Sequence, residues 1–162
     1  MNEKTKGLIS VFVVALDAAP GATYWSLVQN LANGPSGLSQ EELSSLIVGS
    51  PQFKSLYPPP AIKPDASAGA DSVFSDALIT RVLGNASLSP EARAGALLAG
   101  ESIMAEAKKA GQGDDARRAT LITSLSEYLS AIKTDPGQTG YDAAQPYLAV
   151  AKQLSSKVAV AD

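Results

Sequence analysis

The stretch "LISVFVVAL", residues 8–16, is an apolar run of nine residues that follows a weakly basic start. A short apolar run behind basic residues and ahead of small ones is the pattern of a secretory signal peptide. Glu3 within the basic start and Asp17 directly after the run oppose that interpretation. The run is also too short to span a bilayer, which needs about 20 residues. We therefore expect a first helix over about residues 4–17 that is buried on most of its sides and crosses no membrane.

The next stretch, "YWSLVQNLANG" at residues 24–34, contains the only tryptophan of the chain. Its apolar residues recur at helical spacing, and its Asn-Gly ending is typical of a helix stop. A tryptophan could stack on a sugar ring, but a large aromatic residue at this spacing is more typical of a helical core. The sequence therefore predicts a small structural core made of Tyr24, Trp25, Leu31 and Phe53.

Several acidic residues stand at predicted helix starts. Ser39–Glu42 forms a capping box, and Ser89–Glu91 places a Ser cap before a proline at the first helical position. The adjacent carboxylates Glu41-Glu42 and Asp114-Asp115 could bind calcium or act as acid and base, but at helix starts they offset the macrodipole. The stretch "DPGQTG", residues 135–140, could offer oxygen ligands, yet it lacks the spacing of an EF-hand and is expected to be a turn.

Two basic pairs flank the glycine-containing connection at residues 111–113. Lys108-Lys109 precede it and Arg117-Arg118 follow it. They could meet an anionic sugar, but we expect them to be solvated helix ends. The long helix that ends here also has a face of small residues, which permits another helix to approach closely. These small residues are Ala94, Ala99, Gly100 and Ala105.

The composition changes at "YPPPAIKPDASAGA", residues 57–70, which has four prolines and no periodicity. We expect an extended linker at residues 58–69, between a small multi-helix subdomain at residues 1–57 and a helical bundle at residues 70–162. Within the bundle, the last helix is expected to begin at about Tyr141. Since no segment shows sustained strand alternation, the predicted fold class is all-α.

The composition excludes several classes of function. Cys and His are absent, which excludes disulfides, thiol nucleophiles, Ser-His-Asp triads and ordinary zinc sites. The net charge of −3 argues against nucleic acid as a partner. Oxygen-only binding of calcium or magnesium stays open. A glycosidase would need two facing carboxylates about 5–10 Å apart. Helix caps and the solvated surface explain most of the acidic residues, so we expect no enzyme.

The first part of the chain also resembles a known protein family. The ordered marks Gly21-x-x-Tyr24-Trp25, then Leu31 and Gly34, then Gly49-Ser50-Pro51-Gln52-Phe53 resemble a small helical repeat domain, nominally of unknown function, in large secreted bacterial proteins. The family pattern runs Gly-x-x-Tyr-Trp, a Leu-x-x-Gly helix end, and Ser-Pro-Glu-Phe. The resemblance covers roughly residues 5–57. Gln52 replaces the usual Glu, and the family's Arg-x-Pro-Asp is not kept in "ALDAAPG".

The second half resembles the helical N-terminal regions of S-layer proteins that Gram-negative bacteria export by type I secretion. Its stretches "FSDALITRVLGNASLSPEARAG", residues 74–95, and "QLSSKVAVAD", residues 153–162, carry this resemblance. It implies a secreted protein of the bacterial cell surface, without a cleaved signal peptide, whose relatives continue into calcium-binding Gly-Asp repeats.

The same resemblance implies a non-enzymatic module that attaches the layer to lipopolysaccharide or another surface polysaccharide. It assigns no individual contact residue, and it leaves open whether Ca²⁺ bridges protein and polysaccharide. The alternative is a self-assembly unit that forms a lattice or filament through protein–protein contacts. Low charge, at 18% of residues, and alanine-rich helices favour such self-association.

Overall fold

The chain folds into helices throughout its described parts. A computed structural model describes residues 3–18, 20–34, 37–58 and 67–160, and the side chains of residues 22–24, 27, 31 and 67–69 lie outside this description. These parts form eight α-helices and no strand, which confirms the predicted all-α class. The helices are α1 (Glu3–Leu16), α2 (Ala22–Ala32), α3 (Gln40–Val48), α4 (Pro51–Leu56), α5 (Ser67–Leu83), α6 (Pro90–Lys109), α7 (Asp114–Ala131) and α8 (Leu148–Val160).

The apolar run near the start of the chain lies at the centre of the core. Every residue from Gly7 to Ala15 in α1 is buried. Ser10, the one hydroxyl in this run, donates a hydrogen bond of 2.8 Å to the carbonyl oxygen of Lys6. A helix that is apolar all round must have neighbours all round, and α1 packs against α3, α4, α7 and α8. The first helix therefore organises the others.

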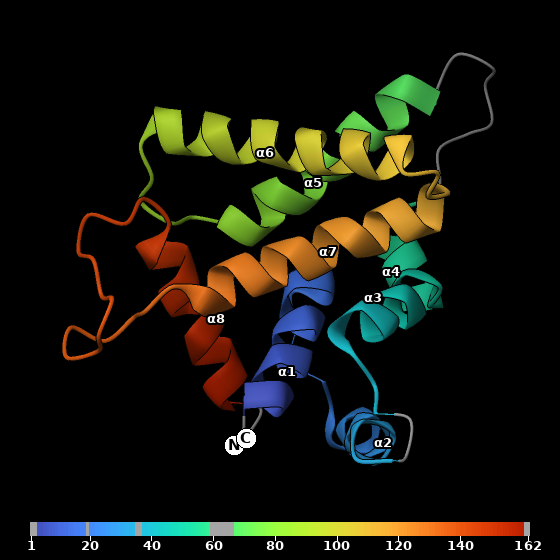
Figure 1. Ribbon diagram of the computed structural model, residues 1–162, viewed down its shortest axis with the longest axis horizontal. Helices are drawn as coiled ribbons and strands as arrows, with labels where there is room; N and C mark the ends of the chain where they lie inside the picture. Colours follow the sequence, from blue (N-terminus) through green and yellow to red (C-terminus); the bar gives the residue numbers. More distant parts are fainter. Residues whose placement is uncertain (1–2, 19, 35–36, 59–66, 161–162) are drawn as a thin grey trace.

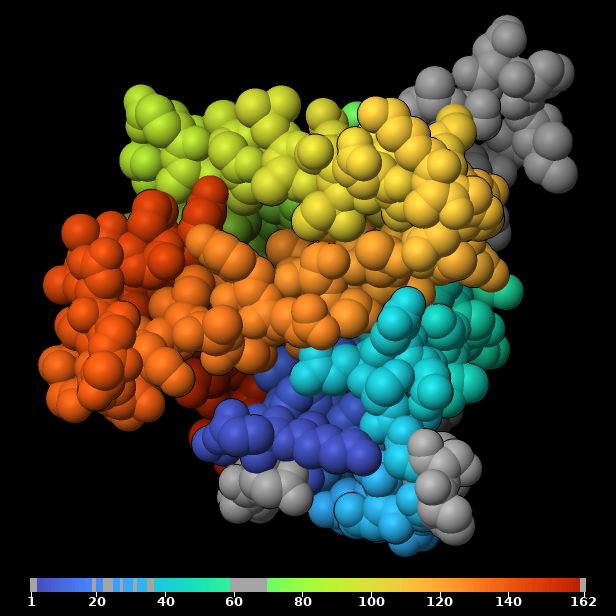
Figure 2. Space-filling model, in the orientation of Figure 1, coloured from blue at the N-terminus to red at the C-terminus, as the bar shows by residue number. Residues whose placement is uncertain are grey.

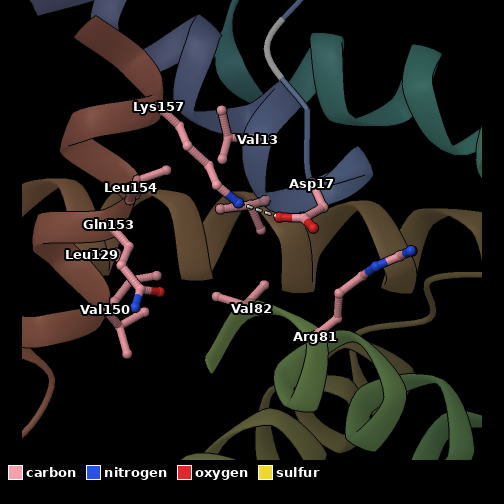
Figure 3. Close-up of a pocket in the computed structure, with 10 residues that line it drawn as sticks. Val13, Asp17, Arg81, Val82, Leu129, Val150, Gln153, Leu154 and Lys157 are labelled. Carbon is pink, nitrogen blue, oxygen red and sulfur yellow. Dashed lines mark hydrogen bonds and ion pairs between the residues drawn. The ribbon is translucent and has the colours of Figure 1, made fainter. Parts of the chain in front are cut away.

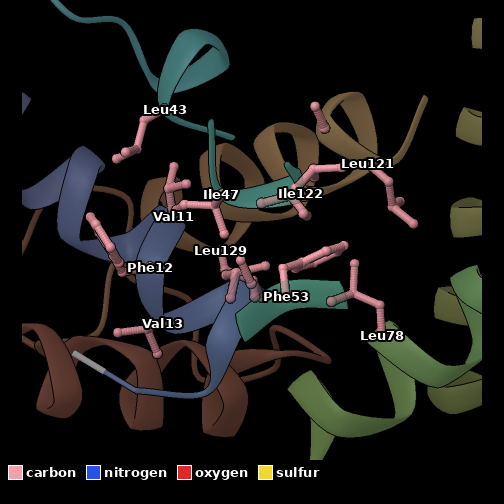
Figure 4. Packing of buried hydrophobic residues seen from close by; sticks show 14 of the residues in the cluster. Val11, Phe12, Val13, Leu43, Ile47, Phe53, Leu78, Leu121, Ile122 and Leu129 are labelled. Atoms are coloured by element: carbon pink, nitrogen blue, oxygen red, sulfur yellow. The ribbon is translucent and has the colours of Figure 1, made fainter. Parts of the chain in front are cut away.

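Helix α7 separates two groups of helices (Figure 1). On one side α5 and α6 pack together, and on the other α1, α3 and α8 contact α7. Buried side chains of all eight described helices join in one cluster, and Figure 4 shows part of it around Val11, Ile47, Phe53, Leu78 and Ile122. Helices from both sides of the predicted linker thus share a core.

The predicted division into two subdomains stays a prediction about the chain. Residues 59–66 of the predicted linker lie outside the described residues. Residues 67–69, which were also expected to be linker, already belong to α5. The amphipathic pattern first becomes visible at Val73, because the turn before it consists of small residues that carry little hydrophobic signal.

The predicted helix caps are confirmed. The Ser39 hydroxyl accepts a hydrogen bond of 3.1 Å from the Glu42 amide, and the Glu42 carboxylate accepts one of 3.1 Å from the Ser39 amide, so the capping box is complete. Ser89 caps α6 by accepting a hydrogen bond of 3.1 Å from the Ala92 amide. Helices α6 and α7 begin at Pro90 and Asp114, as their start signals predict.

The predicted start of the last helix is wrong. This helix begins at Leu148 instead of about Tyr141, and residues 133–147 form turns. The Asp142 carboxylate accepts a hydrogen bond of 2.9 Å from the Ala144 amide, and the Gln145 side chain accepts one of 3.0 Å from the Tyr147 amide. Pro146 lacks an amide hydrogen and disfavours the helical conformation of the residue before it. These local contacts replace helical ones.

The predicted structural core is described only in part. Phe53 is fully buried, and its ring centroid lies 5.0 Å from that of Tyr57 and 6.0 Å from that of Phe74. Trp25 is half-buried and packs against the core. The side chains of Tyr24 and Leu31 lie outside the description.

Candidate functional site

The two arginines at the start of α7 are buried, so the prediction of solvated helix ends is wrong for them. Arg117 is 6% exposed and Arg118 is 9% exposed. Arg117 Nη2 donates a hydrogen bond of 3.1 Å to Asp71 Oδ1, and its Nε lies 2.9 Å from Oδ2 as an ion pair outside hydrogen-bonding geometry. Arg117 also pairs with Asp114 and donates a hydrogen bond of 2.8 Å to the Gln112 carbonyl oxygen.

These contacts keep Arg117 charged and inside the protein. Burial alone would lower the pKa of Arg117, but Asp71 and Asp114 together raise the pKa above its ordinary value. A buried charge needs such partners, because an unpaired one would lose its hydration without compensation. The spacing of Asp114 and Arg117 along one helix could have indicated this local pair. The pairing with Asp71 on α5 could not have been found, because it joins residues 46 positions apart.

Arg118 holds the end of α4 against α5. Its Nη1 donates a hydrogen bond of 3.0 Å to the Tyr57 carbonyl oxygen, and its guanidinium carbon lies 4.5 Å from the centroid of the Phe74 ring. Burial lowers the pKa of Arg118. Both guanidinium groups are therefore engaged within the fold and are not presented to an anionic sugar.

An apolar hollow of about 290 Å³ lies between α5, α6 and α7. Figure 2 shows the face on which α6 and α7 run side by side, with the segment between α7 and α8 on the left. An apolar cavity of about 150 Å³ is enough to bind benzene, so this hollow has room for a larger group. It is lined by Ile79, Val82, Leu83, Ala96, Ala99, Gly100, Ile103, Ser124, Leu125, Tyr128, Leu129 and Tyr147.

The hollow exists because α6 turns small side chains toward two helices that carry larger ones. A Cβ atom added at Gly100 would lie 2.2 Å from Ile79 Cδ1 and 2.5 Å from Ser75 Oγ, so α5 and α6 touch at this point. Next to this contact, Ala96 and Ala99 leave space unfilled. Only Gly100 is buried among the small residues predicted to permit close packing, since Ala94, Ala99 and Ala105 are exposed.

Two tyrosines border the hollow. Tyr128 on α7 is 50% exposed, and its ring meets that of Tyr147 edge to face, with the centroids 6.0 Å apart at 75°. The Tyr147 hydroxyl donates a hydrogen bond of 2.8 Å to the Ala92 carbonyl oxygen on α6. Burial, and then the neighbouring Tyr128, raise the pKa of Tyr147, so it stays a neutral donor. The hydrogen bond positions the Tyr147 ring, and the ring contact packs it against the half-exposed Tyr128 ring.

The sequence does not predict this pair. Periodicity assigns Tyr147 to the apolar face of the last helix, and Tyr128 belongs to no motif. The two residues meet only because the segment between α7 and α8 folds back onto α6. Trp25 and Phe53, the described members of the predicted core, do not line the hollow.

The electrostatic character of the hollow is neutral. None of the described residues that line it carries a charge at neutral pH, and its polar groups are the hydroxyls of Ser124, Tyr128 and Tyr147. Within the described parts of the chain, the Ser124 side chain makes no hydrogen bond. The lining can therefore bind an uncharged group, but it offers no acid–base pair for catalysis.

A second, smaller cleft lies between the end of α1, α5 and α8 (Figure 3). Lys157 of α8 forms an ion pair with Asp17, which ends α1 at a left-handed φ of 54°. Arg81 also borders this cleft. Its volume is about 30 Å³, which leaves room for no more than a few water molecules. The ion pair therefore joins α1 to α8 at this end of the fold, and the cleft itself is too small for a sugar.

None of the described helices combines the length and the apolar composition that crossing a bilayer requires. Within the described ranges, no three His, Cys, Asp or Glu side chains come together closely enough to hold a metal ion. Comparisons of the chain with models of protein families, with curated proteins and with solved structures find no significant match.

Proposed function

We propose that this chain is a non-enzymatic module of a secreted bacterial surface protein, and that it anchors that protein to surface polysaccharide. The observation that carries the proposal is the half-exposed Tyr128 ring, held by Tyr147 beside a recess without charged lining. An aromatic ring offers an apolar face on which the C–H face of a neutral sugar can stack, and its hydroxyl offers a polar edge.

The resemblance to S-layer proteins supplies the partner and the location. On this proposal the protein leaves the cell by type I secretion and binds lipopolysaccharide on the outer membrane. The turns that lead up to Tyr147 expose Thr139 and Asp142. The side chains of these two residues suit hydrogen bonding to sugar hydroxyls. Ca²⁺ would strengthen attachment by bridging carboxylates such as Asp142 to anionic groups of the polysaccharide.

The test is retention of the purified protein on lipopolysaccharide. We expect Tyr128→Ser to weaken retention by about tenfold or more, because a rigid aromatic anchor commonly carries over about 1.4 kcal/mol of binding energy. Leu46→Ser is the matched control, since Leu46 is 59% exposed on α3 and lies outside the hollow. Equal retention of both variants would contradict the role of Tyr128, and no retention of the parent protein would remove the proposal.

The same assay tests the calcium bridge. A chelator should weaken retention and leave the helical circular dichroism spectrum unchanged, because the described helices are joined by a continuous apolar core. Retention that does not respond to chelator would assign binding to direct hydrogen bonds and ring stacking.

Self-assembly is the second candidate function. It is favoured by large apolar side chains on the surface, which are Leu46, Val73, Leu98 and Val160, between 59% and 84% exposed. Surface apolar residues of this kind can form contacts between copies. Sedimentation that shows oligomers growing with concentration, without polysaccharide, would support this function. A monomer at all concentrations would contradict it.

A further inference from the structure

We propose that the hollow between α5, α6 and α7 is a binding site for a small uncharged molecule with an aliphatic body and one hydroxyl or carbonyl group. This site goes beyond the anchoring role, because a sugar would stack on the outer face of Tyr128 while this ligand would lie behind it.

The size of the hollow defines the size of the ligand. A volume of about 290 Å³ is roughly twice that of an apolar cavity that binds benzene, so the ligand has about ten to fifteen non-hydrogen atoms. A single water molecule would find few partners here, because most lining groups are aliphatic. An apolar molecule loses unfavourable contact with water on entering such a space.

The walls select an aliphatic body. Branched side chains come from all three helices, with Ile79, Ile103 and Leu125 among them. The small residues Ala96, Ala99 and Gly100 complete the wall that α6 forms. The two tyrosine rings border the hollow. Tyr147 is positioned by the hydrogen bond that it donates to the Ala92 carbonyl oxygen, and its ring packs against that of Tyr128. The space is therefore formed before a ligand arrives and does not need a rearrangement of the helices.

The absence of charge excludes ionic ligands from the inside. None of the described lining residues is charged at neutral pH, and a buried carboxylate or ammonium group without a partner would be strongly disfavoured. A neutral hydroxyl or carbonyl group has a partner, since the Ser124 hydroxyl lines the hollow and makes no hydrogen bond within the described parts of the chain. A hydroxyl can both donate and accept.

The test uses 1-octanol as the probe and protein-observed NMR as the readout. We expect saturable shifts that are confined to residues lining the hollow. Ala99→Phe should fill the space and weaken octanol binding by tenfold or more. Ala105→Phe is the matched control, because Ala105 is also exposed on α6 but does not line the hollow. Ser124→Ala should weaken octanol binding several-fold.

Three outcomes would overturn the inference: no saturable binding of octanol by the parent protein, parental affinity in Ala99→Phe, or equal losses in Ala99→Phe and Ala105→Phe. The retention assay on lipopolysaccharide separates this site from the proposed function. Ala99→Phe should keep parental retention, whereas Tyr128→Ser should lose it. Octanol binding without retention would leave this inference intact and remove only the anchoring role.

Discussion

Single residues show where burial and charge conflict in this protein. Asp76 lies on α5 with its Oδ1 atom out of contact with solvent and without a hydrogen-bond partner among the described residues. The nearby Glu101 of α6 accepts a hydrogen bond of 2.6 Å from the Ser72 hydroxyl. Burial, and then the charge of Glu101, raise the pKa of Asp76 above its ordinary value of 3.8. The contact between α5 and α6 therefore contains a carboxylate that is poorly stabilised.

We expect Asp76→Asn to stabilise the protein at neutral pH and to lose most of this advantage near about pH 4. Because the folded-state pKa of Asp76 lies above its unfolded-state value, the native protein takes up the proton first as the pH falls. The ionised side chain thus lowers stability at neutral pH, and the loss disappears as the pH falls through the folded-state pKa. Thermal melting at both pH values measures this.

The control is Asp135→Asn, since Asp135 is exposed in the turn after α7. It should change the melting temperature little at either pH. A lower melting temperature for Asp76→Asn at neutral pH would show that the carboxylate is stabilised by a contact that the asparagine cannot make.

Individual elements show what could be predicted from the sequence. Helices that begin with a side-chain cap, such as α3 and α6, start where the signals at Ser39 and Ser89 place them, because a cap is a local contact. Helix α8 begins later than the apolar periodicity near Tyr147 indicates, because Pro146 opposes a helix there. The hollow and its tyrosines could not be predicted, because they depend on how three helices meet.

The contact of α5 with α6 can be tested through two glycines of α6. Gly95→Ala should raise the free energy of unfolding by about 0.5–1 kcal/mol, because alanine favours a helix, and the new Cβ would meet only the Tyr147 hydroxyl at 3.5 Å. Gly100→Ala should lower it, because Ile79 and Ser75 would have to move. The two variants should differ by about 1–3 kcal/mol. Chemical denaturation measures the free energy of unfolding of both variants. Equal effects would mean that the contact between α5 and α6 accommodates the added methyl group without cost.

The whole molecule is held together by α1. Because α1 packs against α3 from one half of the chain and against α7 and α8 from the other, neither half buries its apolar surface alone. The sequence indicates that residues 8–16 are buried, but not that two of the helices that cover them, α7 and α8, come from the far end of the chain. Periodicity reports which face of a helix is buried and not which helix covers it.

We therefore expect one calorimetric unfolding transition for the whole chain. Leu8→Ala, which truncates a side chain that is 1% exposed, should lower the free energy of unfolding by about 2–5 kcal/mol and shift the entire peak. Two peaks, of which Leu8→Ala shifts only one, would instead support separate subdomains at residues 1–57 and 70–162.

The central position of α1 also has a consequence in time. During synthesis α1 leaves the ribosome well before α7 and α8, and at about 5–20 residues per second the wait is on the order of ten seconds or more. Throughout this interval α3 and α4 can contact α1, but the faces of α1 that α7 and α8 cover stay exposed. Completion of the fold must wait for the last helix, so the nascent chain stays open to chaperones, or to an export machine that threads unfolded chains, until α8 has emerged.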